Sequence, residues 1–460
     1  MSAATASPVR TTLSARMSAK LTRRLSQHVL RLGWDDAELA AHQRERLRVL
    51  LAHAAEHSPF HARRLRGLDP GRFEVGDLAR LPVMTKAQVM AEFDDVVTDR
   101  RLSRALAERH LAASLHEPGL LLDEYVCLTS GGSSGVRGVF VQTLGEYTDF
   151  ATSVLRPGYA RAVAAGGPPP GGLVLAMVGA ASPVHSTGFA AAVASGPPVR
   201  LIPAPATLPL AELVARLNAA QPPALLGYAS KLAELAREQL AGRLGITPRA
   251  VSSMAEVLTP QDQAIIERAF AVPVVNSFAS TEGLVGHSVP GGSVLSFASD
   301  MCLAEPVDSG GNPVPPGVPS GKVLITNLHN LTQPLIRYEL TDQFTSLETA
   351  PGTGWLRASI DGRADEVLRY GGVAVHPHVI RTALASVGMI REYQVRQTRD
   401  GIDVACVTDS HLDEAALARR LEHALRHAGL TEPRAGVRLA EAIPRDSRTG
   451  KVRRFIPRSE

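Results

Sequence analysis

The sequence contains very little cysteine. Cys127, Cys302 and Cys406 are the three cysteines in 460 residues, and they lie far apart. This excludes a disulfide framework and the close Cys spacings that are typical of structural zinc sites. Isolated thiols suit a reducing compartment, so we expect a cytoplasmic protein.

Long apolar runs are also missing. The longest, residues 173–194, contains Pro183, His185 and several small polar residues, and we interpret it as a buried strand and loop instead of a membrane span. Residues 1–34 carry six basic residues and no acidic one, but no apolar segment of the kind found in secretory signals. We therefore expect a disordered basic N-terminus and no membrane partner.

Lysine is scarce although basic residues are common. Five of the 49 basic residues are lysine, at positions 20, 86, 231, 322 and 451, and the rest are arginine. Each lysine is therefore informative, because this chain uses arginine wherever a general positive charge is enough. The net charge is only +4, and basic residues do not cluster with aromatic ones, so nucleic acid is not expected as a partner.

The sequence does contain a long alternating pattern. Strand-like runs alternate with helical segments from Gly166 to Thr281, which predicts βαβ units and a largely parallel sheet. Helices are predicted at 144–164 and, with Thr85 as N-cap, at 85–93. Gly/Pro-rich turns between strand signals at about 288–344 predict a β subdomain. Beyond a boundary at 361–365, a βαββαβ order predicts a small α+β domain.

One segment, Val126–Phe140 (VCLTSGGSSGVRGVF), runs from apolar residues into a loop of Gly, Ser and Thr. Glycines let successive backbone N–H groups point into one concavity, and hydroxyls add further donors, which favours a phosphate ligand. A flexible linker is the alternative, and the Walker spacing with its lysine is absent. The candidate phosphate-binding residues are Thr129, Ser130, Gly132, Ser133, Ser134, Gly135 and Arg137.

Four further segments follow in order. In NSFASTEG, Thr281 offers a hydroxyl to a phosphate and Glu282 a hard oxygen ligand to Mg²⁺, although helix capping explains the same residues. In LIRYELTDQF, Asp342 could accept hydrogen bonds from two ribose hydroxyls, or it could be an ordinary turn residue at the end of a strand.

Of the last two segments, one begins at the predicted boundary and the other lies near the C-terminus. DGRADEVLRYGGVAVHP contains Arg363, Asp365 and the pair Gly371–Gly372, and fits either a functional joint or a polar linker. In RTGK, a turn presents Lys451, which fits either a positioned charge or a solvated basic tail.

The order and spacing of the five segments resemble the core motifs of the adenylate-forming superfamily, which includes acyl- and aryl-CoA synthetases, peptide-synthetase adenylation domains and luciferases. RLRVLLAHAAEHSPFHARRL and LARLPVMTKAQVMAEFD resemble the phenylacetate–CoA ligase-like branch. The resemblance covers about Glu45 to the C-terminus. It implies an α/β fold with a large N-terminal domain at 35–361, built of mostly parallel sheets flanked by helices, and a small mobile α+β C-terminal domain at 365–460.

The resemblance also implies roles for particular residues. The Gly/Ser loop would hold the β- and γ-phosphates of ATP, with Ser280 and Thr281 near the α-phosphate and Glu282 on Mg²⁺. Asp342 and Arg363 would hold the ribose, and Ala255 and Glu256 would lie along the adenine. Lys451 would bridge the acid and the α-phosphate. Asp365 would be the hinge, and Gly371–Gly372 would reach a pantetheine tunnel. The acid pocket would consist of His185, Ser186, Gly188, Phe189, Tyr228 and Ser280.

The implied activity is activation of a carboxylic acid as acyl-AMP with release of pyrophosphate, followed by transfer to CoA or a carrier pantetheine. Phe189 and Tyr228 could sandwich an aromatic ring, which favours an aryl or arylalkyl acid of bacterial secondary metabolism. His185 could orient the acid or simply belong to the core. Transfer to an amine, ATP-dependent activation of nitrite for diazotisation, and a degenerate nucleotide-binding protein are the alternatives. A monomer or homodimer is expected.

Two departures from the family pattern stand out. The loop ends in Val136-Arg137-Gly138 where the family usually has Pro-Lys, which puts the role of that lysine in doubt. Relatives in this branch often carry a Cys/His zinc cluster, whereas the middle of this chain offers Cys302 and His287 without a cluster. The sequence therefore predicts no zinc.

Overall fold

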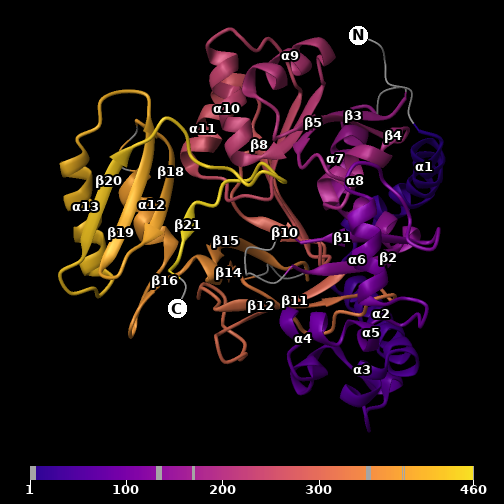
Figure 1. The fold of residues 1–460 in the computed structure, drawn as a ribbon. Helices are drawn as coiled ribbons and strands as arrows, with labels where there is room; N and C mark the ends of the chain where they lie inside the picture. The colour runs from indigo at the N-terminus through magenta and orange to yellow at the C-terminus, as the bar shows by residue number, and fades with distance from the viewer. Residues whose placement is uncertain are drawn as a thin grey trace.

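A ten-stranded mixed sheet organises the large N-terminal part of the chain (Figure 1). The computed structural model describes residues 7–130, 137–167, 171–348, 354–385, 387 and 389–458. The strand order is β14-β15-β10-β9-β8-β7-β6-β3-β5-β4, and the five strands from β8 to β5 run parallel. The parallel strands are β3 (Leu173–Gly179), β5 (Val199–Pro205), β6 (Ala224–Tyr228), β7 (Ala250–Met254) and β8 (Val274–Ala279). The prediction of a parallel α/β core is confirmed.

The helices between these strands follow the predicted alternation. Short connections bring each parallel strand back to the same direction, as βαβ units require. The helices of this region are α7 (Leu144–Ala164), α8 (Ser186–Val193), α9 (Leu210–Ala220), α10 (Ala229–Leu240) and α11 (Pro260–Phe270). The bounds of α7 match the prediction, and its N-cap Thr143 forms a capping box with Glu146.

Further helices precede the sheet. Ser58 both ends α2 and caps α3, which explains the break at Ser58-Pro59. Thr85 caps α4 as predicted. These helices are α2 (Asp36–His57), α3 (Pro59–Arg64), α4 (Lys86–Ala91), α5 (Phe93–Val96) and α6 (Arg104–Ala113). They lead to the hairpin of β1 (Tyr125–Thr129) and β2 (Val139–Thr143).

The β-rich stretch predicted at 288–344 divides between two sheets. Its outer strands continue the large sheet in antiparallel fashion, and the others form a separate three-stranded sheet. The former are β9 (Val285–Ser288), β10 (Leu295–Phe297), β14 (Asp342–Ser346) and β15 (Arg357–Arg363), and β4 (Ser195–Gly196) closes the opposite edge. The three-stranded sheet comprises β11 (Cys302–Val307), β12 (Lys322–Asn327) and β13 (Tyr338–Leu340).

The disorder predicted for residues 1–34 is wrong for Pro8–Leu30, which forms helix α1. Leu13, Met17, Leu21 and Leu25 recur every four residues and are at most 3% exposed. They pack toward α7 and α8, where α1 lies beside β4 in Figure 1. Three of the basic residues that suggested disorder, Arg16, Arg24 and Arg31, form ion pairs with the body of the protein.

The C-terminal unit has the predicted α+β character. A four-stranded sheet of order β20-β19-β18-β21 follows the small β16–β17 hairpin. Its elements are β16 (Leu368–Tyr370), β17 (Val373–Val375), α12 (Pro377–Ala385), β18 (Ile390–Gln397), β19 (Gly401–Thr408), α13 (Glu414–His427), β20 (Arg434–Leu439) and β21 (Phe455–Ile456). In Figure 1 this unit lies on the left, and its yellow C-terminal segment extends to the middle of the molecule. No helix among the described residues is long and apolar enough to cross a membrane.

A buried ion pair ties α7 to the segment that follows β10. Both Nη atoms of Arg156 contact the carboxylate of Asp300, at 2.7 and 2.6 Å, and both side chains are almost fully buried. Burial raises the pKa of Asp300, but the hydrogen bonds and charge of Arg156 outweigh it and leave this pKa lowered.

We expect Arg156→Met to reduce the free energy of unfolding by about 3–5 kcal/mol, because it leaves the Asp300 carboxylate buried without its main partner. The exposed pair of Arg216 and Glu212 provides the control, and Arg216→Met should cost about 0.5 kcal/mol or less. Urea unfolding of the three proteins measures both effects. Equal losses in the two variants would contradict the assignment.

Candidate functional site

An apolar cavity opens at the carboxyl ends of the parallel strands. The chain turns to one side of β3 to form β5 and to the other side to form β6, and ligands of open α/β sheets bind at such a switch point. The cavity holds about 1010 Å³ of empty space, including the part that opens to solvent. The residues of its polar mouth are Thr129, His185, Ser186, Thr187, Tyr228, Thr281, Thr449 and Lys451.

Lys451 reaches the mouth from the C-terminal segment. The carboxylate of Asp446 accepts hydrogen bonds from the N–H groups of Arg448 and Thr449, which shapes the turn before the lysine. Gly450 has φ +76°, and a Cβ there would lie 2.9 Å from Ala206, so this turn packs too closely for another residue. The Nζ atom of Lys451 lies 5.2 Å from the centre of the Tyr228 ring. Burial lowers the pKa of Lys451, and the charge of Glu256 acts against this shift.

Glu256 fixes this segment to the large domain. One carboxylate oxygen accepts the N–H of Ser230 at 3.0 Å, and the other accepts the N–H of Val452 at 3.1 Å. Arg445 adds a second link, because it donates to Ser230 Oγ and pairs with Glu234 and Glu392. The preceding Ala255 has φ +62° and lines the cavity.

The predicted motif at 276–283 forms a tight turn after β8. Ser280 N–H donates to Leu284 O at 2.9 Å, and Ser280 Oγ accepts the N–H of Leu284. Gly283 has φ +114°, and a Cβ there would clash with Asn327, whose amide donates to Glu282 O. Thr281 faces the cavity, and Glu282 is 7% exposed. Burial raises the pKa of the Glu282 carboxyl.

Asp342 and Arg363 are opposite partners in the pairing of β14 with β15. Arg363 also donates to Asp365 at 2.9 Å and to Thr341 at 3.0 Å. Burial raises the pKa of Asp342 although the charge of Arg363 lowers it. For Arg363, the charges of Asp342 and Asp365 outweigh burial and raise the pKa. The Oδ2 atom of Asp365 is buried and has no hydrogen-bond partner among the described residues.

His185 and Thr129 lie together at the mouth. Thr129 Oγ1 is 3.5 Å from His185 Nδ1, and the N–H of Thr129 donates to Val184 O. Burial lowers the pKa of His185, and the charge of Lys451 acts in the same direction. The neighbouring Ser130 accepts the N–H of Gly138 and so closes the base of the loop. Arg137 is exposed, and Gly132, Ser133, Ser134 and Gly135 lie outside the described residues.

Not every predicted pocket residue lines the cavity. Phe189 is buried and packs edge-on against Tyr147, so the predicted sandwich of a ring between Phe189 and Tyr228 does not form. Gly188 lets α8 approach Ser182 closely, since a Cβ there would meet its carbonyl at 2.1 Å. Gly371–Gly372 form the exposed β16–β17 turn, away from the cavity in this arrangement. No group of three or more His, Cys, Asp or Glu side chains suited to a metal occurs among the described residues.

The sequence analysis missed two contributions. Met17 and Leu21 of α1 line the cavity, from a segment expected to be disordered. Lys86 begins α4, which is placed by the pairing of Met84 with Tyr338, and its charge opposes the rise in pKa of both Glu282 and Asp342. The scarcity of lysine, and its place within LARLPVMTKAQVMAEFD, were the signals that could have assigned Lys86 to the site.

Comparison with known proteins agrees with this arrangement. No family model matches the chain. It is 26% identical over 255 residues to protein CapK of Staphylococcus aureus, covering 53% of this chain and 54% of CapK. The match therefore spans about half the length of that relative. The chain is 27% identical over 399 residues to phenylacetate-coenzyme A ligase of Thermus thermophilus, covering 83% and 81% of the two chains.

Among solved structures, 2-hydroxyisobutyryl-CoA ligase in its postadenylation state has a TM-score of 0.70 at 21% identity, covering 92% of this chain and 90% of that one. The same enzyme in its thioesterification state, at the same coverage, has a TM-score of 0.55. The chain therefore has the fold of these acyl-AMP-binding CoA ligases. In sequence it is similar to phenylacetate–CoA ligase over most of its length.

The electrostatics of Glu282 lead to a stability prediction. Because burial raises the folded-state pKa of this carboxyl, its ionisation destabilises the ligand-free fold, increasingly so as pH rises above the unfolded value of 4.5. We expect Glu282→Gln to be more stable than wild type at pH 8, with the difference vanishing near pH 4. Urea unfolding at several pH values measures this difference.

Asp300 provides the control with the opposite sign. Burial raises its pKa, but Arg156 at 2.6 Å outweighs this and lowers it, so its ionised form stabilises the fold. Asp300→Asn should therefore destabilise the protein at pH 8, because it leaves the buried guanidinium of Arg156 with a weaker partner. A loss of stability of similar size in Glu282→Gln would contradict the prediction.

Proposed function

We propose that this protein activates a carboxylic acid with ATP to form acyl-AMP and pyrophosphate, and then transfers the acyl group to the thiol of CoA or a carrier pantetheine. The observation that carries the proposal is the position of Lys451, a partly desolvated cation at the mouth of a deep apolar cavity. The mouth also adjoins Thr129, which ends β1, and Thr281, which follows β8 of a different sheet.

The first half-reaction joins two anions. A carboxylate oxygen attacks the α-phosphorus of ATP, the bond to the bridging oxygen breaks, and pyrophosphate leaves. Repulsion between the anions opposes this approach, so a fixed positive charge between them lowers the barrier. Lys451 supplies that charge, and the apolar body of the acid lies in the cavity below it. His185, whose pKa burial lowers, is neutral at pH 7 and serves to orient the carboxylate.

The nucleotide would extend from the mouth toward β14 and β15. Asp342 and Arg363 would hold the ribose, with Ala255 beside the adenine and Thr281 at the α-phosphate. The base of the Gly/Ser loop, at Thr129 and Ser130, would carry the β- and γ-phosphates. Glu282 fits a magnesium ligand, because it is a buried carboxylate without an ion-pair partner in the described part of the chain. Magnesium would neutralise phosphate charge there.

The second half-reaction requires Lys451 to leave the mouth. We infer that the C-terminal domain rotates about Asp365 and so brings Gly371–Gly372 to the mouth of the tunnel through which the pantetheine thiol enters. We assign the present arrangement to the adenylating state, because Lys451 lies at the mouth, and the higher TM-score against the postadenylation structure supports this assignment. Rotation must break the Glu256 contact with Val452, the Arg445–Glu234 pair and the 3.1 Å pair of Arg454 with Asp262.

An aryl or arylalkyl acid of secondary metabolism remains a hypothesis, now without the Phe189 sandwich. A different acceptor, such as an amine, or nitrite in place of the acid, uses the same nucleotide site and stays an alternative. The apolar depth of the cavity favours an acid over nitrite, because nitrite would leave that volume empty. Pyrophosphate release with acids and with nitrite, with and without CoA, tests all of these. If neither any acid nor nitrite causes release of pyrophosphate, the result favours a degenerate nucleotide-binding protein.

Lys451→Ala should separate the two half-reactions. Loss of the bridging charge is expected to lower the rate of acyl-AMP formation by about 10²–10³-fold or more. Thioester formation from supplied acyl-AMP should stay within about threefold of wild type, because Lys451 is then outside the site. Rapid-quench measurement of each half-reaction makes the comparison.

Lys322 offers a control on the large domain, since its ammonium pairs with Glu339 at 2.9 Å and does not line the cavity. Lys322→Ala should leave both rates within about twofold of wild type. An equal loss of both half-reactions in Lys451→Ala would refute the two-state assignment.

A further inference from the structure

The inner part of the cavity is lined mainly by apolar side chains. Beyond the mouth, no charged side chain of the described residues lines it, and the walls come from α1, α7, α8 and the face of the sheet. The inner residues are Met17, Leu21, Tyr147, Phe150, Ala151, Val154, Leu155, Met177, Ala190, Val193, Ala194, Leu201, Leu226, Met254 and Ala279. Aliphatic and methionine side chains predominate, and such walls adapt to flexible apolar ligands.

The sheet register gives the length of this channel. Tyr228 and Leu226 point to the same face, and Leu226 pairs with Met177. Met177 also pairs with Pro203, so Leu201 lies two residues deeper than Met177 and four residues deeper than Tyr228. At about 3.3 Å per residue, the channel extends about 13 Å along the sheet from the level of Tyr228 to that of Leu201.

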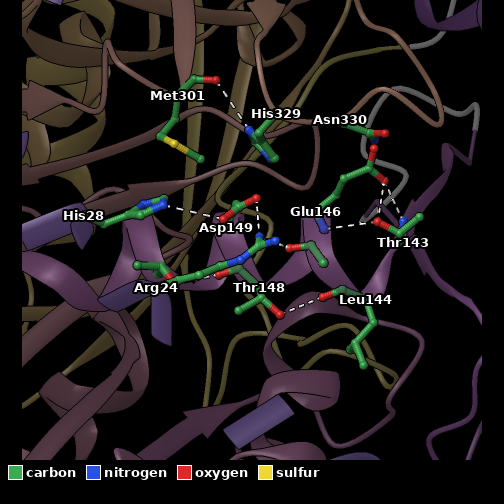
Figure 2. Close-up of polar contacts among 12 residues, drawn as sticks. Arg24, His28, Thr143, Leu144, Glu146, Thr148, Asp149, Met301, His329 and Asn330 are labelled. Carbon is green, nitrogen blue, oxygen red and sulfur yellow. Dashed lines mark hydrogen bonds and ion pairs between the residues drawn. The ribbon is translucent and has the colours of Figure 1, made fainter. Parts of the chain in front are cut away.

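Helix α1 contributes one wall of the channel, and its Ser14 contacts Ser195, which pairs with Arg200 near the start of β5, level with the deep end. Met17 and Leu21 line the cavity, and the hydroxyl of Thr148 on α7 lies 3.4 Å from Met17 Sδ. Figure 2 shows the polar contacts that hold α1 on α7: Arg24 and His28 both contact Asp149. Arg24 also donates to Gly145 O at 2.7 Å.

The charges at this contact favour a fixed helix. Burial raises the pKa of Asp149, but His28 and Arg24 outweigh it and keep this carboxyl ionised at neutral pH. Ser14 hydrogen-bonds to Ser195 of β4, so α1 is attached at the sheet edge as well. Helix α1 is therefore fixed in position as a wall of the channel.

We propose that the acid is an unbranched apolar chain of about eight to ten carbons beyond its carboxylate, lying along the β3–β6 face, and that Met17 and Leu21 end its channel and select its length. The inference rests on the proposed acid activation. At about 1.25 Å per carbon in an extended chain, 13 Å accommodates about ten carbons. A benzoate or phenylacetate body fills only the outer half and leaves the inner walls without contacts.

The first test measures kcat/KM for pyrophosphate release with straight-chain acids from four to sixteen carbons, together with benzoate and phenylacetate. We expect a rise of about threefold to fourfold per added methylene up to an optimum near nine to eleven carbons in total, because each methylene leaves water. Longer chains should then lose activity, because they meet α1. An optimum with benzoate or phenylacetate, or no dependence on chain length, would overturn the inference.

The second test moves the end of the channel. Met17→Trp and Leu21→Trp should shift the optimum to acids shorter by two to four carbons, and Met17→Ala should shift it to longer ones. Leu13→Ala is the matched control, because Leu13 is buried on the same face of α1 but does not line the cavity. It should lower stability as core truncations do and leave the length profile unchanged.

Circular dichroism melting identifies any variant that fails to fold, and the profile of Met17→Ala against Leu13→Ala then decides between packing and selection. Equal profiles in these two variants would overturn the role of α1. Failure of the proposed function is a different result: no acid of any kind would release pyrophosphate. Activity confined to aryl acids would uphold the function and refute only the chain-length inference.

Discussion

The carboxylate of Glu256 is the contact on which the site depends most. It accepts backbone N–H groups from Ser230 in the large domain and from Val452 beside the lysine. Hydrogen bonds to an ionised acceptor are among the stronger ones in proteins, and two of them on one carboxylate fix direction as well as distance. This carboxylate joins the residue next to Lys451 directly to the large domain, and the link of Arg445 to Ser230 and the close packing of Gly450 on Ala206 support it. Backbone donors also make the contact independent of the side chain at 452.

The charges of the site are arranged at a cost to the free protein. Burial raises the pKa values of Glu282 and Asp342 and lowers that of Lys451, which favours the neutral form of each group. The neighbouring opposite charges compensate only in part. Groups with shifted pKa values cluster at functional sites for this reason. Anionic phosphates and a divalent cation would complete the set, so binding and stability are linked. The buried pair of Arg156 and Asp300 differs, since each partner there neutralises the other.

The sequence predicted much of the fold because its parallel core obeys local rules. The bounds of α7 and the alternation of strands and helices from Gly166 to Thr281 follow from apolar periodicity and capping alone. The α1 helix escaped prediction because its basic composition resembles that of disordered tails, while its burial depends on α7 and α8, which are distant in sequence. The position of Phe189 could not be predicted for the same reason. An aromatic side chain fits a ligand pocket, but the orientation of α8 directs this one into the core.

The candidate site was predictable only through the order of its motifs. Thr281, Asp342 and Lys451 each had an ordinary structural explanation, and their significance lay in occurring together. The double contact of Glu256 could not be predicted, because it joins backbone groups whose positions depend on tertiary packing. The position of Lys86 depends likewise on the pairing of Met84 with β13.

The wall that α1 contributes has a consequence for how such a site can change over evolutionary time. Met17 and Leu21 belong to one helix that carries none of the groups assigned to ATP, Mg²⁺ or the bridging charge. Substitutions on this face can therefore alter what the cavity accepts while the phosphate chemistry stays untouched. Substrate preference and catalytic apparatus are separable traits in this architecture, and new specificity could arise in small steps, each leaving a working enzyme.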